Sequence, residues 1–512
     1  MGPGEPLKPT FSRRGLLGGG WVGAAHARGH RPRGGKSGAL PAPAVQRRAR
    51  LQIIGAGIAG LAAARAFGRA GVADVHLLEL EDRPGGNSRS HSIAGITCPQ
   101  GAHCLPLPGP AAHELSEWLF ELGLLKSELG RTVADERHLC HSPQERLFID
   151  GAWAEGLLPP ADPGSATMAA YRQFARRVAD VQKLGFALPS QRAPWTPGHA
   201  ALDAVTFDRW LAREGLVDAR LRWYLDCCCR DDYGAGSAVV SAWAGLHYFA
   251  SRHGFHAPGD EESEREPVFT WPEGNAWLAE RLTAPFAANS AGRLHTGRTV
   301  LRVAEARHDV GVLAWDEAAT QAELWTADTV VLALPLFIAA RLVEIPSDAL
   351  KSAAALLPQA PWLVANLHID RPLLPRVGAP ASWGNVIHGS HGLGYVDAGH
   401  QSLQPIAGAT VLTAYRPLPP ADRSSLLAED WQVWAGRVLA DLGTVHPDLP
   451  RRLQPVDLKR YGHATAVPAP AVRGSPALAA LRAQRGRLRF AHADLAGYSV
   501  FEEAFTLGMA VG

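Results

Sequence analysis

Three glycines near the start of the chain have the spacing of a phosphate-binding turn. Gly55, Gly57 and Gly60 follow a short apolar run at 51–54 and open an alanine-rich, helix-forming segment at 61–67. In such a strand–turn–helix unit the first glycine permits the tight bend, the second lets a pyrophosphate approach the backbone, and the third lets helix pack on strand. The free N–H groups at the helix start favour an anion. The pattern predicts a dinucleotide site.

An acidic residue follows at the distance that such a site needs. A second apolar run, 75–78, ends in Glu79, about 20 residues after Gly60. A carboxylate at that point can accept hydrogen bonds from ribose hydroxyls. A glycine-rich turn without a ligand is the alternative, but the full set of strand, glycines, helix, second strand and acid favours the ligand.

The residues after Glu79 distinguish a flavin from a nicotinamide. Arg83, Gly85 and Gly86 continue the segment as E-x-x-x-R-x-G-G. This segment resembles that of the flavin-containing amine oxidase and phytoene desaturase superfamily, in which it wraps the FAD ribose and diphosphate. A nicotinamide-only domain has no reason to carry it. The resemblance therefore implies FAD as the cofactor.

Later segments resemble the same superfamily. They are a loop at 101–103, a strand around 300 that flanks the adenine in the family, an acid after the closing strand and a final helix that begins at 501–502. The cofactor-binding residues implied by turn and resemblance together are Gly55, Ala56, Gly57, Gly60, Glu79, Arg83, Gly85, Gly86, Gly101, Ala102, His103, Val300, Asp494, Phe501 and Glu502.

The chain departs from the family pattern at three positions. Asn87 stands where many relatives have an arginine after the double glycine, and Arg89 is a candidate to replace it. Asn275 replaces the second glycine of a Pro-Gly-Gly turn, and Glu503 replaces a glycine in the final helix. The Glu503 change leaves the surroundings of the flavin ring open.

Catalytic residues are not assigned by the sequence. In relatives that oxidise amines, a lysine on a substrate-domain strand holds a water at flavin N5. The matching strand, 362–369, has no lysine, and Asn366 or His368 lies near that place. Tyr461 lies in a segment that resembles a flavin-side motif of the family and is a third candidate. Without the lysine, we expect slow reoxidation by oxygen and electron transfer to another acceptor.

The expected function is FAD-dependent oxidation of a small molecule, with an amine as the substrate and hydride transfer to flavin N5 as the reaction. A carotenoid-type desaturase or isomerase is the first alternative, and a flavin-binding protein without turnover is the second. This choice rests on the resemblance alone, since one fold supports many reactions. No metal site is expected, because the histidines are dispersed and no paired C-x-x-C occurs.

The expected fold is α/β, with a Rossmann-like FAD-binding domain and an interleaved α+β substrate domain. The FAD domain is predicted over 50–112, 266–345 and 456–512. The substrate domain is predicted over 113–265, mostly helical, and over 346–455.

The first 50 residues differ from the rest of the chain. They hold ten of the 51 Lys and Arg residues and one acid, so the rest of the chain is mildly acidic, and a nucleic-acid partner is not expected. Residues 1–27 resemble a twin-arginine export signal, with Arg13-Arg14, a weakly apolar stretch and a small-x-small site at 25–27. Periplasmic location is expected, with a cytoplasmic protein carrying an Arg-rich tail as the alternative. Residues 28–49 are predicted to be a linker.

The remaining composition excludes several classes. A 46% apolar and 20% charged chain is typical of a globular protein. No run reaches the roughly 20 apolar residues that a membrane-spanning helix needs. Cys227–Cys229 are expected to be buried in a helix, and the sequence leaves open whether Cys98 and Cys104 form a disulfide.

Overall fold

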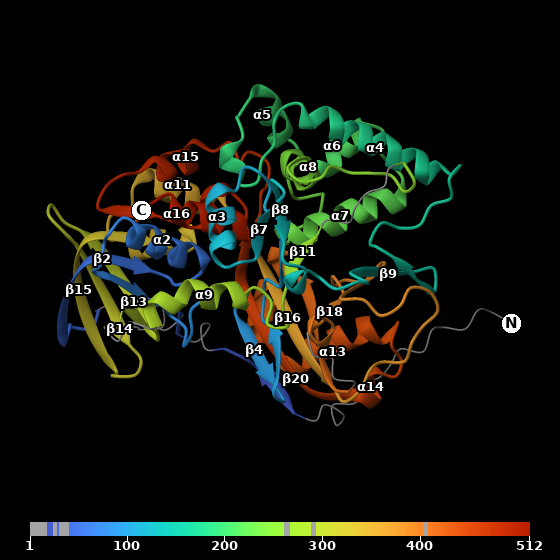
Figure 1. Ribbon diagram of the computed structural model, residues 1–512. Helices are drawn as coiled ribbons and strands as arrows, with labels where there is room; N and C mark the ends of the chain where they lie inside the picture. Colours follow the sequence, from blue (N-terminus) through green and yellow to red (C-terminus); the bar gives the residue numbers. More distant parts are fainter. Residues whose placement is uncertain (1–17, 24–27, 30–39, 261–266, 288–292, 403–407) are drawn as a thin grey trace.

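Two β-sheets with helices on both faces organise the chain in the computed structural model (Figure 1). The structure describes residues 18–23, 28–29, 40–260, 267–287, 293–402 and 408–512. The chain passes from one sheet to the other several times, so each sheet combines segments that are far apart in sequence. The predicted α/β fold with an interleaved second domain is confirmed.

The first sheet carries the predicted dinucleotide turn. Its order is β12–β3–β2–β15–β14–β13, with β21 beside β15. Its core pairs are parallel, whereas β13 and β14 are antiparallel additions. The strands are β2 (Val45–Ile54), β3 (Val75–Leu78), β12 (Leu294–His295), β13 (Arg298–Glu305), β14 (Val310–Asp316), β15 (Gln321–Leu332) and β21 (Leu488–Phe490). β2 is buried without a break over 51–54, as expected for a parallel strand covered on both faces.

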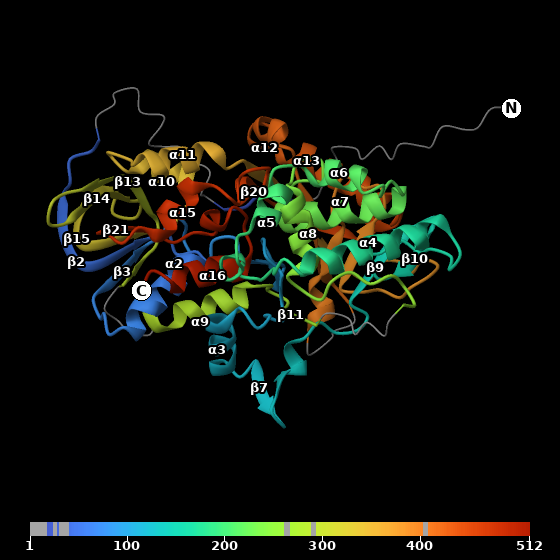
Figure 2. The ribbon, with the colours of Figure 1, turned by 90° about the horizontal axis from the view of Figure 1, so that it is seen from above.

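Helices cover both faces of this sheet (Figure 2). One face packs against α2 (Ile58–Arg69), α3 (His113–Glu121), α9 (Ala276–Ala287) and α16 (Phe501–Met509). The other face packs against α10 (Leu336–Leu342), α11 (Asp348–Leu356) and α15 (Pro476–Ala483). α16 lies directly on the start of α2, since a Cβ at Gly508 would be 2.3 Å from the Ala59 carbonyl oxygen.

The second sheet has the order β1–β20–β16–β19–β18–β17–β9–β10. Its strands are β1 (Gly19–Trp21), β9 (Glu145–Ile149), β10 (Ala152–Glu155), β16 (Gln359–Ile369), β17 (Gly384–Ile387), β18 (Tyr395–Asp397), β19 (Thr410–Pro417) and β20 (Leu453–Ala466). Above it in Figure 1 lie α4 (Ala166–Gln182), α5 (Pro197–Asp203), α6 (Phe207–Arg213), α7 (Ala219–Tyr233) and α8 (Ala242–Ala250). The opposite side carries α12 (Arg423–Ala428), α13 (Trp431–Gly443) and α14 (Leu449–Arg452). None of the described helices is long and apolar enough to span a membrane.

Short elements complete the described chain. They are β4 (Ser90–Ile93), β5 (Ile96–Pro99), β6 (Cys104–Pro106), β7 (Leu125–Glu128), β8 (Arg131–Ala134), β11 (Val268–Thr270) and the 3-10 helices at 136–138, 190–192, 398–401, 420–422 and 493–496. β6 and β11 form a two-stranded ladder that links the loop after residue 100 to the segment before α9.

Capping fixes the ends of α7, the helix that matters most for the site below. The Asp218 side chain accepts a hydrogen bond from the Leu221 amide at 2.9 Å, which satisfies a free N–H group of the first turn. Gly234 ends the helix with φ +70°, and a Cβ there would lie 2.6 Å from the Ala360 side chain. Only glycine fits this close approach to β16 without strain.

The structure differs from the predicted segment boundaries at three places. The segment 113–155 is less helical than predicted, because it holds β7 to β10 after α3. The predicted linker at 28–49 contributes its last residues to β2, which begins at Val45. The predicted boundary at 456 falls inside β20, which belongs to the second sheet. Periodicity alone does not show which sheet a strand joins.

The N-terminal prediction is only partly within the described chain. Arg13 and Arg14 lie outside the described residues. Residues 19–21 form β1, at the edge of the second sheet. The six cysteines are free thiols, and Cys227–Cys229 are buried in α7.

Candidate active site

The turn between β2 and α2 has the geometry of a diphosphate site. Gly55 has φ +99°, and a Cβ there would lie 2.4 Å from the Ala333 carbonyl oxygen. A Cβ at Gly60 would lie 1.9 Å from the Gly55 carbonyl oxygen, so both positions require glycine. At Gly57 a Cβ would meet only Gly86, at 3.8 Å, which leaves an open cradle above the turn. No described side chain caps α2, so its first N–H groups remain available to an anion.

Glu79 ends β3 beside this cradle. Its carboxylate accepts hydrogen bonds from the Ala56 amide at 2.8 Å and from the Glu81 amide at 2.9 Å. Burial raises the pKa of Glu79, and these two hydrogen bonds oppose the shift. Each carboxylate oxygen retains a lone pair for a ribose hydroxyl.

The double-glycine segment closes over the same turn. The Gly85 amide donates to the Ala56 carbonyl at 2.8 Å, and Gly85 and Gly86 both have positive φ, +115° and +57°. Arg83 is exposed. The Arg89 side chain pairs with Glu81 at 2.8 Å and donates to the Gly86 carbonyl at 3.1 Å, so it braces the segment from within. The open cradle, the acid and this segment fit the adenosine diphosphate part of FAD.

The loop at 101–103 is clamped from three sides. A Cβ at Gly101 would lie 2.2 Å from the Asn87 carbonyl oxygen. The Tyr415 hydroxyl donates to the Gly101 carbonyl at 2.9 Å, and the backbone N–H of Asn275 donates to the Ala102 carbonyl at 3.0 Å. The Asn275 side chain, at the position where the chain departs from the family pattern, donates to the Cys104 carbonyl at 2.8 Å and so braces the residue that follows the loop.

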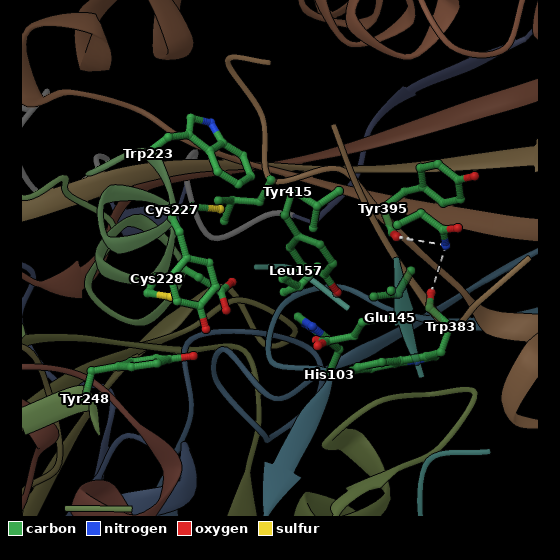
Figure 3. A pocket seen from close by; sticks show the side chains of 17 residues that line it. His103, Glu145, Leu157, Trp223, Cys227, Cys228, Tyr248, Trp383, Tyr395 and Tyr415 are labelled. Carbon is green, nitrogen blue, oxygen red and sulfur yellow. Dashed lines mark hydrogen bonds between the residues drawn. The ribbon is translucent and has the colours of Figure 1, made fainter. Parts of the chain in front are cut away.

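His103 projects from this loop into a pocket (Figure 3). Its ring lies 4.5 Å from the ring of Tyr415 and 5.4 Å from that of Trp383, measured between centroids. Burial lowers the pKa of His103 to about 4, so the ring is neutral at pH 7.

The pocket lies between α7, α8 and the second sheet, and about 630 Å³ of free space lies within it and its mouth, part of it open to solvent. Its walls are mainly aromatic and apolar, with two carboxylates. The lining residues are His103, Glu145, Leu157, Trp223, Tyr224, Cys227, Cys228, Asp231, Tyr248, Trp383, Gly384, Asn385, Val386, Leu393, Tyr395, Val396 and Tyr415.

Asp231 is an acid of this lining with a raised pKa. Burial raises its pKa to about 7, with a further contribution from Asp232. Asp231 is an exposed residue that lines the pocket, and protein atoms surround its carboxylate closely enough to raise its pKa. No hydrogen bond or ion pair joins it to any residue that the structure describes. An unpaired carboxylate with a perturbed pKa in a concave site is a functional candidate.

Sequence reasoning missed Asp231. The signal was present in the helical period, because Tyr224, Cys228 and Asp231 follow the i, i+4, i+7 spacing of one helix face. Only the second sheet, which places β17 to β19 opposite α7, shows that this face borders a pocket.

The start of α16 carries two buried acids, Glu502 and Glu503. Burial raises the pKa of Glu502 to about 7, and the charge of Arg252 opposes the shift. Arg252 pairs with Asp232 at 3.1 Å and also lowers the pKa of Asp231, so it links α16 with α7. Glu503 accepts from the Tyr498 hydroxyl at 2.6 Å, which explains how a buried acid replaces a glycine there.

Two predicted cofactor residues have structural roles in the described chain. Asp494 accepts from the Leu336 amide at 2.8 Å and so caps α10. Burial would raise its pKa, but the charge and hydrogen bond of His492 and the Leu336 amide lower it. Val300 lies on β13 beside an irregularity in the register with β14. Neither residue lines the pocket.

The three predicted catalytic candidates lie outside the pocket lining. The Asn366 side chain is fully buried and donates to the Pro99 carbonyl and to Thr413, both at 2.9 Å. His368 follows two residues later on β16. The Tyr461 hydroxyl donates to the Gln100 carbonyl at 2.8 Å and so holds the residue that precedes the loop at 101–103. On β16 the residues that pack with the pocket walls are Trp362 and Val364, neither of which carries a charge.

Comparisons with known proteins agree with this arrangement. A family model described as flavin containing amine oxidoreductase matches residues 58–511. Polyamine oxidase 6 of Oryza sativa subsp. japonica is 28% identical over 170 residues, which are 31% of this chain and 33% of that relative. The chain thus matches about a third of the length of this curated relative.

Solved structures share the fold at low identity. Putrescine oxidase bound to putrescine is 18% identical, with a TM-score of 0.66 over 91% of this chain and 98% of its own. Cyclohexylamine oxidase from Brevibacterium oxydans IH-35A is also 18% identical, with a TM-score of 0.66 over 90% and 97%. A fatty acid isomerase from P. acnes, described as CLA-producing, is 18% identical, with a TM-score of 0.61 over 90% and 97%. The chain belongs to the family of flavin-containing amine oxidoreductases, whose FAD fits the glycine turn, Glu79 and the clamped loop.

Proposed function

We propose that the protein oxidises an amine and that Asp231 holds the substrate nitrogen in the pocket. The observation that carries the proposal is the unpaired carboxylate of Asp231 among aromatic walls. A carboxylate attracts an alkylammonium ion by charge, and aromatic faces attract it by cation–π interaction. The pocket includes His103, which belongs to the loop that the family's flavin fits.

The chain's own share of the reaction is orientation, exclusion of water and proton transfer. Bound FAD supplies an acceptor for the hydride of the C–H bond next to nitrogen. An alkylammonium ion must lose a proton before that bond can give up a hydride. With a pKa of about 7, Asp231 can accept this proton near neutral pH. His103 stays neutral and adds no charge that would repel the substrate.

The same pocket disfavours the alternative substrate class. The relative from P. acnes is described as a fatty acid isomerase, and a desaturase or isomerase of long hydrocarbons would need an apolar tunnel. Asp231 lines the pocket. An apolar chain would remove its carboxylate from water without offering a charge in return, which is costly.

Anaerobic flavin bleaching tests the proposal. The purified protein is mixed without oxygen with polyamines, aromatic amines, amino acids and, in a separate arm, unsaturated fatty acids and carotenoids. We expect bleaching of the flavin absorbance by one class of amine and by none of the hydrocarbons. Bleaching by hydrocarbons alone supports the isomerase or desaturase. A flavin that no compound bleaches supports a binding protein without turnover.

We further propose that the reduced flavin passes its electrons to an acceptor other than oxygen. The support is the absence of a lysine from β16, where the uncharged Trp362 and Val364 pack with the pocket walls. Stopped-flow mixing of the reduced protein with oxygen and with a quinone checks this. Reoxidation by oxygen as fast as turnover, with no gain from the quinone, would contradict it.

Export by the twin-arginine route, with a periplasmic location, is also a proposal, supported by the residue pattern at 11–27. We expect replacement of Arg13 and Arg14 by lysine to retain the protein in the cytoplasm. Unchanged fractionation would favour the cytoplasmic alternative.

A further inference from the structure

The N-terminal extension supplies a strand to the second sheet. Gly19, Gly20 and Trp21 pair in parallel with Val456, Asp457 and Leu458 of β20. The Val22 amide donates to the Leu458 carbonyl at 2.8 Å. The Trp21 ring lies 4.6 Å from the guanidinium carbon of Arg460. We refer to residues 18–23 as the strap.

Three glycines of the strap differ in how much room a side chain would have. Gly19 has φ +126°, and a Cβ there would lie 2.0 Å from the Val456 carbonyl oxygen. Gly23 has φ +87°, and a Cβ there would lie 2.0 Å from Lys459 Nζ. A Cβ at Gly20 would meet no described atom within 4 Å. Glycine is therefore favoured at Gly19 by close approach to the β20 backbone and at Gly23 by its positive φ, whereas neither reason applies at Gly20.

The strap covers an ion pair that reaches the FAD site. Lys459 Nζ lies 3.1 Å from Glu81 Oε1, and both side chains are buried, with 5% and 6% of their surface exposed. Arg89 and Lys459 lower the pKa of Glu81 to about 2, against the effect of burial. The Glu81 amide donates to Glu79, the acid at the ribose position. The contacts thus run from Gly23 through Lys459 and Glu81 to Glu79.

A second contact places the extension on the same segment. The Arg28 side chain donates to the Leu80 carbonyl at 3.0 Å. Leu80 lies between Glu79 and Glu81, so the extension meets the ribose segment both directly and through Lys459.

We propose that the strap is an intramolecular ligand of the β20 edge and that its docking retains FAD. An extended chain that adds to an open sheet edge is a general mode of peptide binding. Water weakens an ion pair, so a docked strap keeps the Lys459–Glu81 pair strong and holds Glu79 in place. The strap lies within the segment that resembles an export signal, so removal of residues 1–27 would also remove this contact.

Matched glycine variants test the proposal with the FAD-loaded protein. Gly19→Ala and Gly23→Ala should displace the strap, whereas Gly20→Ala, the same chemical change at an open position, should not. Hydrogen exchange of residues 18–23, followed by mass spectrometry, reports docking. The rate of FAD release, followed by flavin fluorescence on dilution, reports retention. We expect fast exchange and a release rate raised about tenfold in the two displaced variants, and wild-type behaviour in Gly20→Ala.

A second variant separates docking from retention. Lys459→Met keeps a side chain under Gly23 but removes the ion pair, so we expect faster FAD release with the strap still protected from exchange. Exchange of the wild-type strap as fast as that of an unstructured peptide would overturn the docking. A displaced strap in Gly23→Ala with FAD release equal to that of Gly20→Ala would overturn the retention. None of these readouts requires an amine substrate, so they are independent of the proposed reaction.

Discussion

The FAD turn and the pocket differ in how far apart their residues lie in the sequence. The glycine turn, Glu79 and the double glycine all fall within residues 55–86, and backbone geometry requires glycine at Gly55 and Gly60. The pocket combines residues from 103 to 415, held by helices of one layer and strands of another. Local spacing therefore encodes the first site, and the packing of distant elements encodes the second. A substitution should affect one site with little effect on the other.

The largest expected effect is in the pocket. Asp231→Asn keeps the size of the side chain but removes the charge that binds the amine and accepts its proton. We expect the rate of flavin reduction by the amine substrate to fall about 10²- to 10⁴-fold, the range for loss of a general acid or base. Rapid-reaction absorbance under anaerobic conditions measures this.

FAD content is the control for this variant. It should be unchanged, because Asp231 lies outside the turn. Asp348→Asn is a matched substitution on the surface, since the Asp348 side chain is 99% exposed, and it should leave the rate unchanged. A reduction rate in Asp231→Asn within a few-fold of wild type would remove Asp231 from the reaction.

In the FAD turn, Glu79→Ala removes the carboxylate that accepts from the Ala56 and Glu81 amides. Loss of hydrogen bonds to a charged group costs about 1.5–3 kcal/mol, so we expect FAD to bind roughly 10- to 100-fold more weakly. Titration of the apoprotein with FAD measures the dissociation constant.

Glu79→Gln is the partner variant, because its side-chain oxygen can still accept a hydrogen bond. It should lose less affinity than Glu79→Ala. Full affinity in Glu79→Ala would contradict the assignment of Glu79 to the ribose.

The FAD turn, which is local in sequence, could be predicted better than the pocket, which distant elements build. The sequence predicts the backbone geometry of the turn, because glycine spacing reports backbone conformation directly, and the structure requires glycine at Gly55 and Gly60. Asp231 was missed, because burial that raises a pKa arises only when α7 faces β17 to β19. The role of β1 was missed for the same reason. In the sequence, its glycines indicate only a segment of low hydrophobicity. The strand that it pairs with, β20, lies more than 430 residues further along the chain, as the pair Gly19 and Val456 shows.

A smaller effect should appear in the pH dependence of the reaction. The pKa of Asp231 is raised to about 7, so the carboxylate form that accepts a proton is lost as pH falls below 7. Flavin reduction should therefore slow about tenfold per pH unit below that value and level off above it. His103, with a pKa of about 4, stays neutral over this range, so it adds no second slope to the plot of rate against pH. A profile that stays flat from pH 5 to about 9 would mean that Asp231 does not titrate in the reaction.

The smallest expected effect concerns Asn366, which the sequence placed near the flavin and the structure ties to its surroundings. Its amide donates to Pro99 and Thr413, while its Oδ1 is buried without a partner among the described residues. Asn366→Leu removes two hydrogen bonds but also removes the cost of that unsatisfied oxygen, so the two effects oppose each other. We expect the free energy of unfolding to change by about 1–2 kcal/mol or less, and flavin reduction to stay within a few-fold of wild type. Thermal unfolding and anaerobic reduction of the same sample measure both quantities.

A reduction rate more than about 100-fold lower with unchanged stability would instead place Asn366 in the chemistry, since effects of that size are typical of acid–base groups. The pocket would then extend along β16, and the contrast between a local cofactor site and a distributed substrate site would weaken.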